Sequence, residues 1–251
     1  MRAVRTFLAT GIVAQVAMVA ALAATIGLSP AGWVVGVACA AVMNAALIRG
    51  VRRYRTNRLG PADWVTLARA TLAVGVAALV ADSFGEPAHV TTLVTLSAVA
   101  LALDAVDGWV ARRSETTSKL GAKFDGEVDA FLILALSVYV ARSTGAWVLT
   151  IGLARYAFFA AGWIWPWMRA PLPPRYWRKV VTAVSGIALT LAASGLGQEW
   201  VGYAATLIAL ALLIESFGRD VVWLVVSHRD EPAVAGAADE HHLERPTRPQ
   251  P

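Results

Sequence analysis

The chain has 251 residues, of which 57% are hydrophobic and only 16% are charged. Together with a mean hydropathy of +0.58, this composition excludes an ordinary soluble globule and predicts an all-α polytopic membrane protein embedded in a lipid bilayer. The net charge of +5 does not indicate a nucleic-acid partner, because the basic residues cluster between apolar runs. The single cysteine, Cys39, excludes a disulfide within the chain.

Eight apolar runs follow one another along the chain, each of about 20 residues, the length that crosses the hydrocarbon of a bilayer. The first could be a signal peptide, but a second run follows after a short Ser-Pro turn, which favours an uncleaved helical hairpin. We therefore expect an N-terminal hairpin and basic loop (1–58), a six-helix core (59–228) and a disordered cytoplasmic tail (229–251). The runs cover residues 7–28, 31–49, 64–83, 88–110, 124–142, 145–167, 178–196 and 199–218.

Three loops carry most of the basic residues, and the loops between them carry almost none. By the positive-inside rule, the basic loops face the cytoplasm, which places both termini on the cytoplasmic side of a cell membrane. The basic residues are Arg49, Arg52, Arg53, Arg55 and Arg58 in the first loop, Arg112, Arg113, Lys119 and Lys123 in the second, and Arg169, Arg175, Arg178 and Lys179 in the third.

Four aspartates occupy the facing ends of two successive runs. Asp104 and Asp107 are spaced i and i+3, and Asp125 and Asp129 are spaced i and i+4, so each pair lies on one helix face. The polar segment 113–120 is suited to a turn that folds the two helices together. Four carboxylates in one volume repel one another unless cations lie between them, and oxygen-only ligands suit Mg²⁺ or Mn²⁺. The pattern predicts two divalent cations and a phosphate-bearing substrate.

The same stretch matches the signature D-x2-D-G-x2-A-R-x8-G-x3-D-x3-D, and it resembles the CDP-alcohol phosphotransferase family, in particular phosphatidylglycerophosphate and phosphatidylinositol-phosphate synthases. The resemblance implies a membrane enzyme of phospholipid biosynthesis that transfers a phosphatidyl group from CDP-diacylglycerol to an alcohol and releases CMP. It also implies metal ligation by the four aspartates, and family members commonly form homodimers. The signature positions are Asp104, Asp107, Gly108, Ala111, Arg112, Gly121, Asp125 and Asp129.

The resemblance further implies that Asp129 is catalytic and takes the proton from the acceptor hydroxyl. A carboxylate beside two divalent cations is a weak base, so the metals could instead acidify the hydroxyl while Asp129 orients it. A missing side chain at Gly108 lets a nucleotide approach the backbone, and Arg112 can reach a phosphate or pair with an aspartate. Ser118 matches a hydroxyl position that contacts the nucleotide in related enzymes.

Upstream, Asp63, Thr66 and Arg69 lie on roughly one face of the first core helix. The spacing resembles the family's N-x-x-T-x-x-R element, which lines the nucleotide site, with Asp in place of Asn. Alternatively, Asp63 is an N-cap after Pro61, and the other two residues face neighbouring helices. The candidate nucleotide-binding residues are thus Asp63, Thr66, Arg69, Gly108, Ala111, Arg112, Ser118 and Gly121.

Arg155 lies near the middle of an apolar run, where a permanent cation should face a cavity or a partner. With Arg175, Arg178 and Lys179 at the start of the next helix, it could form a pocket for a phosphorylated acceptor such as glycerol 3-phosphate or inositol phosphate. Positive-inside anchoring also accounts for Arg175 and Arg178. A neutral acceptor (inositol, serine or an amino alcohol), a divalent-cation transporter and an inactive relative are the alternatives.

Overall fold

The computed structural model describes residues 2–54, 60–114, 119–173 and 175–243 of the chain, and the side chains of 4–54, 60–106, 120–173 and 175–228. All regular structure in these ranges is helical, which confirms the predicted all-α class. The elements are α1 (Arg2–Ile26), α2 (Pro30–Tyr54), α3 (Pro61–Asp82), α4 (Val90–Ser114), α5 (Lys119–Thr144), η1 (Ala146–Val148), α6 (Leu149–Ile164), η2 (Pro166–Arg169), α7 (Tyr176–Ser194) and α8 (Glu199–Leu243).

Five helical stretches in the described part of the chain are long and apolar enough to cross a membrane. They coincide with α1, α2, α3, η1 plus α6, and the first 30 residues of α8. A shorter apolar stretch, Val90–Val106, lies in α4, while α5 carries several charged side chains and α7 begins with a polar turn. The bundle is that of a polytopic membrane protein.

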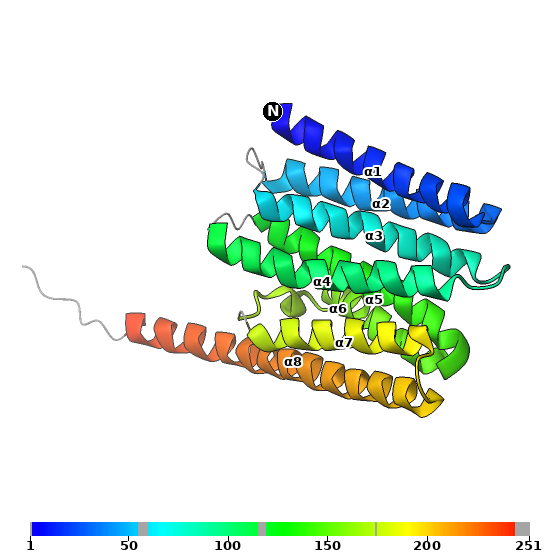
Figure 1. The fold of residues 1–251 in the computed structure, drawn as a ribbon. Helices are drawn as coiled ribbons and strands as arrows, with labels where there is room; N and C mark the ends of the chain where they lie inside the picture. The colour runs from blue at the N-terminus through cyan, green and yellow to red at the C-terminus, as the bar shows by residue number, and fades with distance from the viewer. Residues whose placement is uncertain (1, 55–59, 115–118, 174, 244–251) are drawn as a thin grey trace, which may run out of the picture.

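Successive helices run antiparallel, and α3 lies at the centre of the bundle (Figure 1). It packs against α1, α2, α4 and α5, while α7 packs against α4, α5 and α8. Most of α3 is buried, because its sequence is apolar on all faces and rich in alanine, which lets neighbouring helices approach closely. The helices α1 and α8 lie on opposite sides of the bundle (Figure 1).

The N-terminal pair α1 and α2 packs onto α3. A buried hydrogen bond joins the two helices, from Asn44 Nδ2 to Gln15 Oε1 at 2.7 Å. At the end of α2, a Cβ added to Gly50 would lie 2.5 Å from Leu120 Cδ1, so the backbone of α2 closely approaches the start of α5. The pair therefore covers the same end of the bundle at which α4 ends and α5 begins.

The end of α8 differs from the sequence expectation. A disordered tail was expected from residue 229, whereas α8 continues as a helix to Leu243 and projects beyond the other helices (Figure 1). The added segment contains four alanines after Pro232, and alanine has the strongest intrinsic preference for helix. At 45 residues, α8 is more than twice the length that a bilayer requires, so its C-terminal part extends past the hydrocarbon.

Close contact between α5 and α6 depends on Gly152. A Cβ at this position would lie 2.7 Å from Leu134 Cα and 3.0 Å from Ser137 Cβ. We expect Gly152→Val to force the helices apart and destabilise the protein by about 1–3 kcal/mol, the usual range for overpacking. Thermal unfolding in detergent measures the effect. Gly218→Ala, a helical glycine with open space around it, is the matched control and should leave the unfolding temperature unchanged or slightly raised. An equal loss in both variants would contradict the prediction.

Candidate active site

Three of the four predicted metal ligands converge at one end of the bundle. Asp104 lies in the C-terminal half of α4, and Asp125 and Asp129 lie in the N-terminal half of α5. Each offers a carboxylate oxygen within 4.8 Å of the others. The antiparallel arrangement of α4 and α5 explains the convergence, because it brings the end of one helix beside the start of the next. Asp107 is in the last part of α4, and its side chain lies outside the described residues.

The guanidinium group of Arg69 lies against all three carboxylates. Its Nη1 is 2.9 Å from Asp104 Oδ1 and also pairs with Asp125, while Nη2 pairs with Asp129. The side chain is fully buried, and its Nε donates a hydrogen bond to the carbonyl oxygen of Ala100 at 3.2 Å. The sequence predicts Arg69 to be a nucleotide-binding residue, and these contacts make it in addition the buried counter-cation of the acidic cluster.

The donor set suits a hard divalent cation. Three carboxylates from two helices supply only oxygen ligands, the type that Mg²⁺ and Mn²⁺ prefer. Their mutual repulsion also requires positive charge among them, and a metal ion would supply more of it than the single charge of Arg69. The residues present therefore fit a divalent metal.

Asp63 and Thr66 also point into the bundle, where both side chains are buried. The Asp63 carboxylate accepts a hydrogen bond from the Gly60 backbone N–H at 2.7 Å, which caps the start of α3. The Thr66 hydroxyl donates to the Ala62 carbonyl oxygen at 3.1 Å. Asp63 thus makes a structural contact of the kind that the N-cap alternative predicts, although Gly60 rather than Asp63 is the N-cap residue.

Four of the other predicted nucleotide-binding residues lie in the last part of α4 or the first turn of α5. Gly108, Ala111 and Arg112 are in the last part of α4, but their side-chain surroundings are outside the described residues. Gly121 is in the first turn of α5, and Ser118 lies outside the described residues altogether. Gly108, Ala111, Arg112 and Gly121 thus belong to the same two helices as the carboxylates.

A small cavity of about 150 Å³, which we call the chamber, adjoins Asp129. Arg155 lines the chamber and also has an ionic partner, the two surroundings expected for a cation in a spanning helix. Its Nη2 lies 3.1 Å from Glu127 Oε1, and its Nε is buried with no hydrogen-bond partner in the described part of the protein. A Cβ at Gly126 would come within 3.2 Å of Arg155 Nη2, so the glycine lets the guanidinium approach α5. The lining includes Gly126, Asp129, Arg155, Arg178, Thr182 and Asp220.

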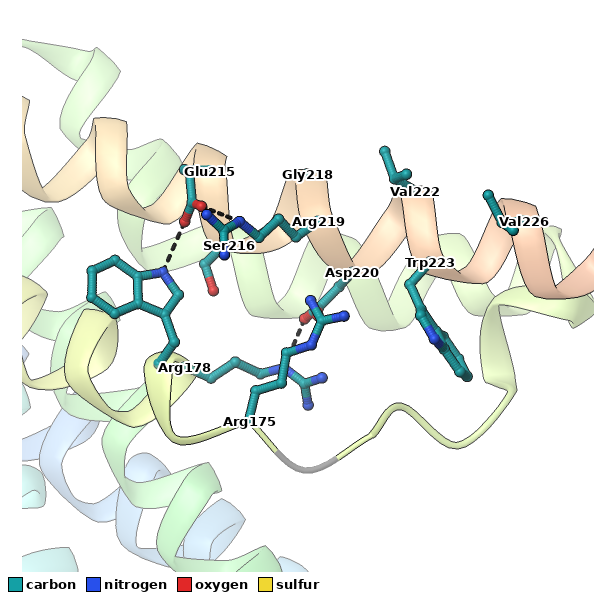
Figure 2. Close-up of a pocket in the computed structure, with 11 residues that line it drawn as sticks. Arg175, Arg178, Glu215, Ser216, Gly218, Arg219, Asp220, Val222, Trp223 and Val226 are labelled. Atoms are coloured by element: carbon teal, nitrogen blue, oxygen red, sulfur yellow. Dashed lines mark hydrogen bonds and ion pairs between the residues drawn. The ribbon is translucent and has the colours of Figure 1, made fainter.

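The basic residues at the start of α7 divide between two positions. Arg178 lines the chamber, and its Nε lies 2.9 Å from Asp220 Oδ2 on α8, while Arg175 Nη1 lies 3.9 Å from Asp220 Oδ1 (Figure 2). Lys179 is exposed and is not part of the chamber lining, but it is close enough to Asp104 for their charges to interact. The four cations predicted to bind an acceptor phosphate therefore do not form a single pocket.

Two acidic residues of this region were not singled out by the sequence. Glu127 stands between Asp125 and Asp129 in the signature, and its pairing with Arg155 depends on how α5 meets α6. Asp220 follows the i,i+4 pair of Glu215 and Arg219 on α8, which forms as the spacing predicts. Asp220 directly precedes the apolar run 221–226, and this is a signal that could have identified it, since a carboxylate beside a spanning segment needs a partner.

The fold and the acidic cluster together define a polytopic membrane protein with a site suited to a divalent metal. The family model described as CDP-alcohol phosphatidyltransferase matches residues 59–215, more than half of the chain, and the chain belongs to this family. No curated protein and no solved structure matches the chain significantly. Membership makes the protein a transferase of phosphatidyl groups from a CDP-alcohol to an alcohol acceptor, which sets aside the transporter alternative. The N-terminal pair α1 and α2 lies outside the matched residues.

Proposed function

We propose that the protein transfers a phosphatidyl group from CDP-diacylglycerol to a phosphorylated polyol, such as glycerol 3-phosphate or inositol phosphate, and releases CMP. The observation that carries this proposal is the chamber in which Asp129 lies together with Arg155 and Arg178. A phosphomonoester would place its phosphate on the two guanidinium groups, which suit phosphate geometry, and its hydroxyl toward Asp129. The product would be an anionic phospholipid that still carries the acceptor phosphate, as in the phosphatidylglycerophosphate and phosphatidylinositol-phosphate synthases.

Asp104, Asp107, Asp125 and Asp129 would hold two divalent cations, Mg²⁺ or Mn²⁺. When bound there, the metals would supply positive charge to a pyrophosphate and to its leaving group. Asp129 then removes or orients the acceptor hydroxyl proton, and Arg155 and Arg178 hold the acceptor phosphate. Arg175 and Lys179 contribute positive charge nearby. The nucleotide would lie along Asp63, Thr66, Arg69, Gly108, Ala111, Arg112, Ser118 and Gly121.

Arg155 is the residue best placed to distinguish a phosphorylated acceptor from a neutral one. Among the described residues, Glu127 is the only ionic partner of Arg155, and the buried Nε donor of Arg155 has no hydrogen-bond partner. An unsatisfied buried donor is unfavourable, and a phosphate oxygen would satisfy it. A neutral polyol or an amino alcohol offers no comparable anion. The basic loops support placing this site, and both termini, on the cytoplasmic side of the cell membrane, where CDP-linked lipids and soluble acceptors would meet.

Arg155→Ala is expected to reduce kcat/KM for a phosphorylated acceptor about ten- to a hundredfold, the effect of losing a charged hydrogen bond. CMP release would be followed with purified protein in lipid, CDP-diacylglycerol and Mg²⁺, against glycerol 3-phosphate, inositol 1-phosphate, inositol and serine. Arg142→Ala is the control, because it also removes one arginine, but Arg142 is exposed and contacts Ser83 and Phe84 near the end of α5 away from the chamber. Release with a neutral alcohol alone, unaffected by Arg155→Ala, would disprove the phosphorylated acceptor while leaving the family activity intact. A homodimer remains a prediction, which the mass of the purified protein in detergent would test.

A further inference from the structure

A second and larger cavity, which we call the groove, opens between the start of α7 and the middle of α8 (Figure 2). Its volume is about 700 Å³, several times that of the chamber. The groove combines cationic and aromatic side chains, a combination that suits an anionic solute near a membrane surface. Its lining includes Arg175, Trp177, Arg178, Arg219, Asp220 and Trp223.

The groove and the chamber meet at a common wall. Arg178, Ser216 and Asp220 line both cavities. The groove is the more open of the two, and Asp129 lies on the chamber side alone. A solute that enters between α7 and α8 would therefore pass Arg178 and Asp220 before reaching the reacting carboxylate.

The carboxylate of Asp220 lies between Arg175 and Arg178 (Figure 2). Its side chain is only 8% exposed, and its two oxygens face different partners, Arg178 at 2.9 Å and Arg175 at 3.9 Å. The contact with Arg178 Nε is an ion pair that lacks hydrogen-bond geometry. Arg178 Nη2 instead donates to the Pro173 carbonyl oxygen at 2.8 Å. The single charge of Asp220 thus balances only one of the two arginines, and Asp220 leaves Arg178 Nε without a hydrogen bond.

We propose that the groove is an access subsite for a phosphomonoester anion, and that the Asp220 carboxylate occupies the phosphate position while the groove is empty. The identity of the anion as the acceptor rests on the proposed function. A phosphate carries more negative charge than a carboxylate and has three oxygens with which to satisfy guanidinium donors, so it displaces Asp220 from Arg178. The anion then moves past Asp220 into the chamber, where Arg155 offers its unsatisfied Nε.

Asp220 also gives the subsite a preference between anions. Two half-buried arginines with no counter-charge would bind any small anion, and their desolvation would be unfavourable in the empty protein. With Asp220 in place, an incoming carboxylate would only replace one carboxylate contact of the arginines by another of the same kind. A phosphate monoester supplies more negative charge and more acceptor oxygens, so the competition favours phosphorylated solutes over amino acids and other carboxylates.

The test measures binding of inorganic phosphate to the purified protein in detergent by calorimetry, with EDTA present so that phosphate cannot bind through a metal. Asp220→Asn removes the competing charge while keeping the side-chain shape, and it is expected to tighten phosphate binding about tenfold. Glu199→Gln is the matched control, because it removes an acid from the same helix but lies at the other end of α8, away from the groove lining. It should leave the affinity unchanged. Arg178→Gln should abolish the binding.

The same variants would be assayed for CMP release. Asp220→Asn is expected to lower KM for the phosphorylated acceptor and leave KM for CDP-diacylglycerol unchanged, a split that a purely structural role would not produce. Unchanged or weaker phosphate binding in Asp220→Asn would overturn the proposal, and so would phosphate binding that survives Arg178→Gln. Unchanged or weaker phosphate binding in Asp220→Asn, together with normal CMP release by the unaltered protein, would reject only the role of Asp220. Absence of CMP release with every acceptor would reject the proposed function, and the phosphate affinities would still decide the role of Asp220.

Discussion

Asp129→Asn is expected to lower the rate of CMP release about a thousandfold or more, the largest effect of any single substitution considered for this protein. Asp129 lies in the acidic cluster, contacts Arg69 and lines the chamber, so it is the residue at which the candidate metal site and the candidate acceptor site meet. Asparagine keeps the shape of the side chain but removes the negative charge. Both roles considered for Asp129, as a base and as an orienting group, depend on that charge.

The rate should be measured with saturating CDP-diacylglycerol and Mg²⁺ and normalised to the amount of folded protein. Asp82→Asn is a suitable control, because Asp82 is also a buried acid. It lies at the C-terminal end of α3, away from the acidic cluster, and its Oδ1 accepts a hydrogen bond from the Ser29 N–H at 2.7 Å. Its specific activity should remain close to that of the unaltered protein. Comparable losses in both variants would indicate damage to the fold rather than to the reaction and would contradict the prediction.

Arg69→Ala is expected to destabilise the metal-free protein by about 3–5 kcal/mol, the usual penalty for leaving buried charges without their partner. Arg69 is the fully buried cation that contacts Asp104, Asp125 and Asp129, so its removal leaves three carboxylates facing one another. Added Mg²⁺ should restore much of the loss, since a ligand that binds only the folded state stabilises it, by about 2.7 kcal/mol at a hundred times its dissociation constant.

Thermal unfolding in EDTA and in Mg²⁺ provides the measurement. The midpoint of Arg69→Ala should rise more on adding Mg²⁺ than that of the unaltered protein, in which Arg69 already supplies a positive charge. Arg69→Lys keeps the charge but cannot contact three carboxylates in the same way. Its midpoint should therefore rise on adding Mg²⁺ by an amount between those of Arg69→Ala and the unaltered protein. Arg142→Ala should show the normal response to Mg²⁺, because Arg142 contacts Ser83 and Phe84 far from the cluster. An identical response to Mg²⁺ in all four proteins would show that Arg69 and the metal do not share ligands.

These two predictions concern one arrangement, in which a permanent internal cation holds together the carboxylates that a divalent metal would use. Arg69 comes from α3, the most buried helix, and its guanidinium reaches acids on α4 and α5. Arg69 thus joins carboxylates of two helices through its own charge and hydrogen bonds. Metal and arginine supply positive charge to the same carboxylates, so the occupancy of one changes the environment of the other.

The sequence alone determined the class of the protein, the approximate positions of the eight α-helices in the described residues, apart from the C-terminal extension of α8, and the placing of Asp125 and Asp129 on one helix. These features are local. Apolar runs of about 20 residues indicate spanning helices, and the i,i+3 and i,i+4 spacings put each pair of acids on one face whatever the rest of the chain does. The signature also led to the family, because its eight positions lie within 26 residues of continuous sequence, from Asp104 to Asp129.

Only the tertiary structure decided which charges meet. Arg69 lies 56 and 60 positions from Asp125 and Asp129 in the sequence, and helical periodicity does not say which face of α3 turns toward α5. The same holds for Arg155 with Glu127 and for Arg178 with Asp220, each a contact between helices. The four predicted acceptor cations likewise divide between the chamber, the groove and an exposed position, because one lies on α6 and the others lie around the start of α7. Contacts between helices depend on how whole faces pack, and sequence spacing along one helix carries no information about its neighbour.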